Sequence, residues 1–137
     1  MIENDLSLEQ RKKINDFIIL KSKDTLWSKF VLMLGIQMKT GLDPKIIVLI
    51  ENKDIDETNR SIKLPNKLIS FSKPNDDNLW DSIMGRKSDS KYLFYRTRIQ
   101  FYPRYKYSLE VDQDLDLPTS LEFFKRRFQH MKSVLNL

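Results

Sequence analysis

The spacing of apolar residues predicts two helices within the first forty residues. Ile14 and Phe17 fall on one face of a helix that begins near Ser7, a residue well suited to cap a helix N-terminus. Residues 25–38 are apolar at most positions, which predicts a second helix that is central and buried. Gly41 follows where a left-handed cap is expected, because glycine adopts this conformation without steric cost.

Shorter elements are expected between residues 43 and 107. Asp43 and Pro44 favour a short helix that runs to about Ile50, since aspartate caps the N-terminus and proline fits the first helical position. The other expected elements are a β-hairpin with strands 61–64 and 67–72, a helix over 76–84, and a strand within 91–107 that leads into a long loop around Pro103.

The last helix has the clearest pattern. Its apolar residues alternate between three- and four-residue spacing from Leu121 to Leu135, and the run from Thr119 to Glu122 matches a capping box. Together the elements predict one α+β domain over residues 1–137, mostly helical with a small antiparallel sheet. The side chains expected to be largely buried are Trp27, Phe30, Leu34, Leu49, Phe124 and Phe128.

The composition restricts the chemistry. The net charge of +5 favours acidic partners, with nucleic acid first among them. The sequence contains no cysteine and a single histidine, His130, which excludes thiol chemistry and metal sites built on several histidines. No apolar run approaches the roughly 18 residues that span a bilayer, and no signal peptide is expected. We therefore expect a cytoplasmic protein without a metal or other cofactor.

Three stretches in the first half of the chain carry a family resemblance. They are Leu6-Ser7-Leu8-Glu9-Gln10, residues 30–35 with Thr40-Gly41-Leu42-Asp43, and Leu49 with Asp54-Ile55-Asp56 followed by residues 60–64. In order and spacing they resemble the opening of a tyrosine-recombinase (phage integrase) catalytic domain. Tyr92-Leu93-Phe94 and the last helix are similar to later steps of the same domain. The resemblance implies the fold of the first half of that domain.

The departures from the family determine what the resemblance implies for activity. The family's arginine, which clamps the scissile phosphate with two hydrogen bonds, is replaced here by Asp43, whose carboxylate repels a phosphate. The resemblance starts near Met1 and stops in the last helix, so we expect neither the family's DNA-clamping domain nor its nucleophilic tyrosine. Only Lys67 corresponds to a catalytic residue, a hairpin-turn lysine. We therefore expect a protein that is not an enzyme.

Aromatic and basic residues alternate between positions 91 and 107, and three interpretations stay open. The residues can stack bases and neutralise phosphates, they can form a protein interface, or the aromatics can fill the core while the cations lie in solvent. The candidate residues for binding a partner or DNA are Arg96, Arg98, Tyr102, Arg104 and Tyr105 in this segment, and Lys125, Arg126 and Arg127 on the last helix.

Three single residues have a structural interpretation beside a functional one. Asp43 can cap the short helix instead of taking part in binding. Lys67 is a candidate phosphate contact, although a solvated turn lysine has the same pattern. His130 lies off the apolar face of the last helix, near Arg126 and Arg127, and its position is typical of a plain surface histidine.

Two functions agree with these patterns. The first is a non-catalytic regulatory protein of phage, prophage or mobile-element origin, which binds a full-length recombinase-fold protein of the same element and modulates that partner's binding to DNA. The resemblance implies this role because the family assembles through contacts between catalytic domains. The alternative is a DNA-binding regulator that uses the basic aromatic segment and the last helix.

Overall fold

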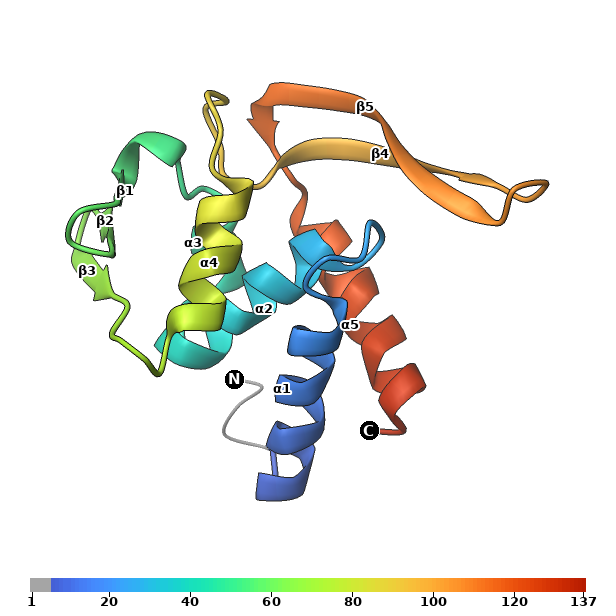
Figure 1. The fold of residues 1–137 in the computed structure, drawn as a ribbon, viewed down its shortest axis with the longest axis horizontal. Coiled ribbons are helices and arrows are strands. Elements are labelled where there is room, and N and C mark those ends of the chain that lie inside the picture. Colours follow the sequence, from blue (N-terminus) through green and yellow to red (C-terminus); the bar gives the residue numbers. More distant parts are fainter. Residues whose placement is uncertain (1–5) are drawn as a thin grey trace. The chain divides into compact units, whose positions relative to one another are not determined.

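The computed structural model describes residues 6–137, apart from the side chains of residues 99–101, 107–113 and 115. Within these residues it contains five α-helices, a three-stranded antiparallel sheet and a two-stranded antiparallel ribbon, which confirms the α+β class (Figure 1). The chain divides into two compact units, and each is described by itself. Unit 1 comprises the chain up to residue 47 together with residues 120–137, and unit 2 comprises residues 48–119. The expected single domain over 1–137 stays a prediction.

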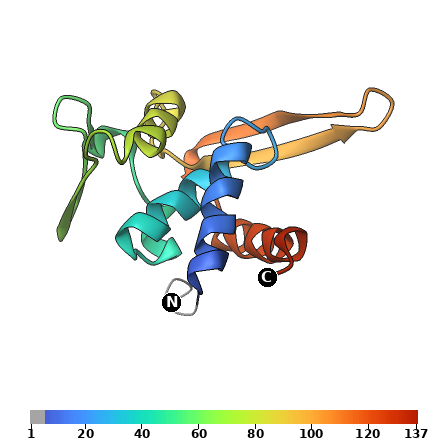
Figure 2. The same ribbon diagram turned by 60° about the horizontal axis from the view of Figure 1, so that its bottom comes forward.

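Unit 1 is built around one buried helix. Its helices are α1 (Leu8–Lys21), α2 (Ser28–Thr40), α3 (Pro44–Ile47) and α5 (Leu121–Leu135). Helix α2 contacts the other three (Figure 2) and is buried along its length from Lys29 to Gln37. The nearly uninterrupted apolar stretch therefore forms the centre of the unit, as predicted, because such a helix needs neighbours on every side.

The helix ends follow local signals, with two shifts. Ser7 forms a capping box with Gln10, and Gly41 caps α2 in the left-handed conformation at φ 72°, both as predicted. Helix α2 starts later than residue 25, because the Asp24 carboxylate accepts a hydrogen bond from the N–H of Leu26 and holds a turn there. The cap of α5 is Ser120, so the capping box predicted from Thr119 to Glu122 is wrong by one residue.

Two of the six expected core residues lie elsewhere. Leu49 is 55% exposed, because α3 ends at Ile47 instead of reaching Ile50 and the following turn directs Val48 and Ile50 inward instead. Phe128 is only half-buried on α5. The other four expected residues are buried, namely Trp27, Phe30, Leu34 and Phe124.

Unit 2 contains the predicted β-hairpin. Strands β2 (Ser61–Leu64) and β3 (Lys67–Ser70) pair antiparallel in a register that joins Leu64 to Lys67, and β1 (Ile55–Asp56) pairs with the other edge of β2. Ile62 and Ile69 lie opposite each other and are buried, which fixes the register. Helix α4 spans Asp77–Arg86, close to the predicted range.

Arg60 joins this sheet to α4. Its backbone is left-handed, with φ 48°, and its Nε donates to the carbonyl of Phe71 at 3.0 Å. One Nη donates to the Asp77 carboxylate at 2.7 Å, and the guanidinium lies 5.9 Å from the ring centre of Trp80. A side chain held by several partners stabilises the unusual backbone conformation.

The segment after residue 91 differs from its prediction. A strand is present, β4 (Tyr95–Tyr102), but the expected long loop is a four-residue turn over 103–106. A second strand follows, β5 (Tyr107–Pro118), which the sequence analysis did not predict. Among the described helices of the chain, none is long and apolar enough to cross a membrane.

Candidate functional site

Strands β4 and β5, with the turn between them, form a two-stranded ribbon over residues 95–118, called the arm below (Figures 1 and 2). Its base is firmly held. The N–H of Thr119 donates to the carbonyl of Phe94 at 2.7 Å, and Phe94 is fully buried. The Nε of Arg86 donates to the carbonyl of Leu93 at 3.0 Å, and its guanidinium lies 5.3 Å from the ring centre of Tyr95.

Beyond this base the arm is supported mainly by itself. Within unit 2, the described residues of β4 and β5 pack against each other and only marginally against other elements. A two-stranded ribbon is marginally stable alone, and its outer edges present backbone groups to any partner that adds a strand or a surface. An element of this kind suits the binding of a macromolecule.

The charges along the arm are balanced. In the backbone register Arg96 lies opposite Asp114 and Arg98 lies opposite Asp112, so each shaft arginine has an aspartate as its cross-strand partner. Opposite charges in this position stabilise a strand pair. Over residues 95–118 the four cations and four acidic residues cancel; they are Arg96, Arg98, Arg104 and Lys106, and Glu110, Asp112, Asp114 and Asp116.

The turn at the end of the arm, residues 103–106, is called the tip. Backbone N–H groups of Tyr105 and Lys106 donate to the carbonyls of Tyr102 and Pro103, at 3.1 and 3.3 Å. The side chain of Tyr105 is 63% exposed, and the guanidinium of Arg104 lies 5.8 Å from its ring centre. Lys106 is exposed and has a left-handed backbone with φ 54°. The tip is thus an ordered turn that presents one aromatic ring and two cations.

The basic residues of α5 differ in their surroundings. Lys125 and Arg126 are exposed, and the Arg126 Nε pairs with Glu122 one turn earlier at 3.2 Å. Arg127 is half-buried, and its guanidinium lies 5.3 Å from the ring centre of Trp27 and 5.7 Å from that of Phe123. Two of the three cations are therefore available to a partner, and the third packs within unit 1.

Trp27 is the centre of that packing. The ring of Phe17 meets it edge-on at 5.0 Å, and the ring of His130 lies 4.9 Å away. Burial lowers the pKa of Arg127 from its ordinary value, and the Asp24 carboxylate opposes this shift. His130 is an exposed residue, as predicted, but it also covers the tryptophan. The single sequence shows no signal for this contact, because Trp27 and His130 are far apart along the chain.

The predicted binding residues do not form one described surface. Tyr102, Arg104 and Tyr105 belong to unit 2, whereas Arg126 and Arg127 belong to unit 1, so each set is considered separately. Tyr102 is half-buried, and the shaft arginines Arg96 and Arg98 are exposed beside their acidic cross-strand neighbours.

The other two single residues singled out in the sequence, Lys67 and Asp43, are on the surface like His130. Lys67 is exposed at the start of β3, in the hairpin turn. Asp43 is exposed, and its carboxylate accepts a hydrogen bond from the N–H of Lys45 at 2.9 Å. This bond satisfies a donor at the start of α3, so the capping role of Asp43 is confirmed.

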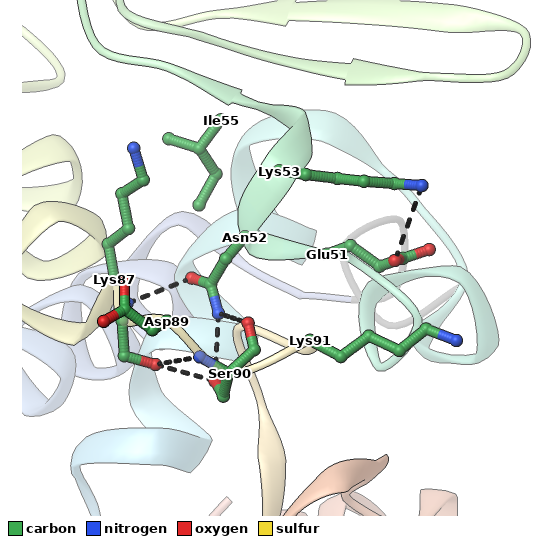
Figure 3. A pocket seen from close by; sticks show the side chains of 9 residues that line it. Glu51, Asn52, Lys53, Ile55, Lys87, Asp89, Ser90 and Lys91 are labelled. Atoms are coloured by element: carbon green, nitrogen blue, oxygen red, sulfur yellow. Dashed lines mark hydrogen bonds and ion pairs between the residues drawn. The ribbon is translucent and has the colours of Figure 1, made fainter.

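A polar pocket of about 430 Å³ lies in unit 2 (Figure 3) and was not predicted. Its floor is Asn52, whose Nδ2 donates to the carbonyl of Ser90 at 2.8 Å and to the Ser90 hydroxyl at 3.0 Å. The Asn52 Oδ1 accepts from the N–H of Ser88 at 3.3 Å. Three lysines, Lys53, Lys87 and Lys91, also line the pocket. Figure 3 shows the Lys87 side chain pointing away from the other two. The polar groups of the Asn52 amide thus already have partners, and their hydrogen bonds hold the loop that precedes β4 in place.

Replacing Asn52 with alanine is expected to loosen that loop. Loss of the buried amide leaves the Ser90 carbonyl without its donor, which should lower the free energy of unfolding by about 2 kcal/mol. Hydrogen exchange should rise in residues 87–92 before other parts of unit 2. Asn59 gives the matched control, because its amide bonds Asp56 at the exposed surface and its replacement should change stability little. Equal losses for both variants would contradict the structural role of Asn52.

Neither a metal site nor a known relative adds to this description. Among the residues that the structure describes, no group of three or more histidine, aspartate or glutamate side chains is placed to hold a metal ion. In comparisons with protein-family models, with curated proteins and with solved structures, nothing matches this chain.

Proposed function

We propose that this chain is a non-catalytic regulatory protein that binds another protein through the arm. The observation that carries the proposal is the form of the arm: a self-supported two-stranded ribbon on a firmly held base, with an exposed tyrosine at its tip. Tyrosine and arginine are the favoured anchors of protein interfaces because they bury a large area and also form hydrogen bonds.

The charge balance of the arm supports a protein partner over DNA. A ribbon that follows a phosphate backbone gains affinity from unpaired cations, because each neutralised phosphate releases counterions. Here Arg96 and Arg98 have acidic cross-strand neighbours, and Asp114 and Asp116 are exposed on the same ribbon. These carboxylates repel phosphates, whereas a mixed-charge surface suits another protein.

The partner that we propose is a full-length recombinase-fold protein of the same phage or mobile element, bound in the cytoplasm. The support for this identity is the resemblance over residues 6–64 and the presence of the hairpin at 61–70, which that resemblance requires. Binding of this chain modulates the partner's occupancy of DNA, since the family assembles through contacts between catalytic domains.

The non-catalytic part of the proposal rests on Asp43. A carboxylate stands where the family has its phosphate-clamping arginine, and it caps α3 instead. Incubation with supercoiled, nicked or branched DNA should yield no cleaved or joined strands and no covalent protein–DNA adduct on denaturing gels. The Asp43→Arg variant should also be inactive, because one arginine does not supply a nucleophile. An adduct formed by either protein would show that the chain is an enzyme.

Affinity capture from the native host tests the binding function. The tagged chain should recover a recombinase-fold protein, and treatment with DNase should leave that recovery unchanged, because the contact is with protein. Adding the purified chain should then change the fraction of DNA that the partner shifts in a mobility-shift assay. Recovery that disappears with DNase, or a partner whose DNA binding is unaffected, would contradict the proposal.

A second candidate function is a DNA-binding regulator. The exposed cations of the tip and of α5, among them Arg104, Lys106, Lys125 and Arg126, favour it. Such binding is expected to be weak and strongly dependent on salt, because contacts to phosphates carry no sequence information. Nanomolar affinity for one DNA sequence at physiological salt, without a protein partner, would favour this function over the first.

A further inference from the structure

We infer that the tip of the arm docks onto an acidic patch of the protein partner, and that Lys106 is a specificity-determining residue of this contact. The inference rests on the proposed function, since it names the chemistry of the surface that the arm binds. It adds Lys106 to the binding residues and removes the shaft arginines Arg96 and Arg98 from them.

The distribution of charge along the arm separates the tip from the shaft. In the register of the ribbon, both shaft arginines have an aspartate as cross-strand partner, Asp114 for Arg96 and Asp112 for Arg98. In the described part of the chain, no ion pair reaches Arg104 or Lys106, and the turn itself contains no acidic residue. The two cations of the arm without an aspartate across the strand pair therefore belong to the turn at its end, which also carries the exposed ring of Tyr105.

The backbone of Lys106 is a second and independent observation. A left-handed φ of 54° favours glycine, because the Cβ atom of any other residue is crowded against the backbone there. Arg60 has a similar φ of 48°, and its side chain is held by Phe71 and Asp77 within unit 2. The exposed Lys106 has no comparable partner in the described part of the chain. A lysine kept in a strained turn without a structural partner points to a use for its ammonium group outside the chain.

The turn also fixes the backbone positions from which the two cationic side chains extend. Pro103 restricts its own backbone, and the two hydrogen bonds within the turn hold residues 102–106 in place. A preorganised turn loses little conformational entropy when it docks. The tip therefore matches a patch with at least two carboxylates spaced around a site for one aromatic ring. Charge complementarity of this kind selects the partner and speeds association.

The first test maps the surface that the tip contacts. A photoreactive benzoylphenylalanine replaces Tyr105 in the full chain, and the cross-linked peptides from the native host are sequenced. We expect protein peptides in which aspartate and glutamate clearly outnumber lysine and arginine. Cross-links to nucleic acid, to peptides without an acidic excess, or to nothing at all would overturn the inference.

The second test separates binding from folding with Lys106→Gly. Glycine suits the left-handed backbone, so the thermal midpoint of unfolding should stay level or rise. Affinity for the purified cross-linked protein should fall about tenfold at physiological salt, as expected for loss of one well-placed charge contact. The control is Lys63→Gln, an equal loss of charge at an exposed residue of β2 in the same unit, which should leave affinity unchanged. Equal affinities for Lys106→Gly and the unaltered chain, or equal losses for both variants, would overturn the role of Lys106.

Failure of this inference can be told apart from failure of the proposed function. If the cross-linked protein has a recombinase fold but the contacted surface has no acidic excess, the proposed function stands and the acidic-patch inference is overturned. An acidic patch on a protein of another fold keeps the inference and overturns the proposed identity of the partner.

Discussion

Replacing Trp27 with alanine should lower the free energy of unfolding of unit 1 by about 3–5 kcal/mol, the loss typical of a large aromatic side chain removed from a packed interior. Trp27 is 7% exposed and contacts the ring of Phe17 edge-on. It also underlies the Arg127 guanidinium and the His130 ring on α5. Its removal therefore leaves a cavity and separates α2 from two residues of the last helix.

Chemical denaturation followed by circular dichroism measures this loss, and hydrogen exchange locates it. We expect faster exchange in α1, α2 and α5, which together form the packing around Trp27. Leu8 gives the control, because its side chain on α1 is 86% exposed and its replacement with alanine should change stability by less than about 0.5 kcal/mol. A Trp27→Ala chain as stable as the Leu8→Ala chain would contradict the central role of this residue.

The double variant Tyr102→Ala, Tyr105→Ala should weaken capture of the protein partner at least about a hundredfold. Aromatic anchors at the centre of an interface commonly contribute more than 2 kcal/mol each, and two of them lie at or beside the tip. Tyr105 is mostly exposed in this chain and Tyr102 is half-buried, so the fold should tolerate both changes. The affinity of the unaltered chain should fall moderately between low and physiological salt, because salt screens the charge contacts of Arg104 and Lys106 but not the buried aromatic contacts.

The matched control for this variant is Leu68→Ala, which removes an apolar side chain that is 62% exposed on β3 of the same unit. It should leave capture unchanged. Circular dichroism of all three chains should coincide. Unchanged capture by the double tyrosine variant would exclude the arm as the main contact and would direct attention to Lys125 and Arg126 on α5.

Local signals account for the parts of the fold that the sequence predicts correctly. The cap at Ser7, the left-handed Gly41 and the hairpin around Pro65 and Asn66 each depend on a few neighbouring residues. The apolar stretch of α2 likewise predicts its own burial. The position where a short helix ends is predicted less well: the sequence places Leu49 in the core because α3 is expected to continue to about Ile50, whereas α3 ends at Ile47 and Leu49 lies at the surface.

The arm shows why the candidate site was only partly predictable. Its aromatic and basic residues are conspicuous in β4 and the turn, so Tyr102, Arg104 and Tyr105 were found from the sequence alone. The sequence did not predict β5 as a strand because, from 109 to 117, acidic residues alternate with residues that are apolar except for Gln113, and a run rich in aspartate favours loops. That alternation, taken by itself, is a strand signal of period two. Only the register of the pair reveals that Arg96 and Arg98 have aspartates as cross-strand partners.

The two tryptophans of the chain are divided between the units, since Trp27 lies in unit 1 and Trp80 in unit 2. Both are buried, at 7% and 5% exposure, so each should emit at short wavelength in the folded chain and shift to longer wavelength on unfolding. Chains with one tryptophan replaced by phenylalanine thus carry a single optical reporter for one unit. Coincident transitions for the two reporters mark a single cooperative unfolding event, and separated transitions mark two. The protein therefore carries its own probes of how far the unfolding of unit 2 depends on that of unit 1.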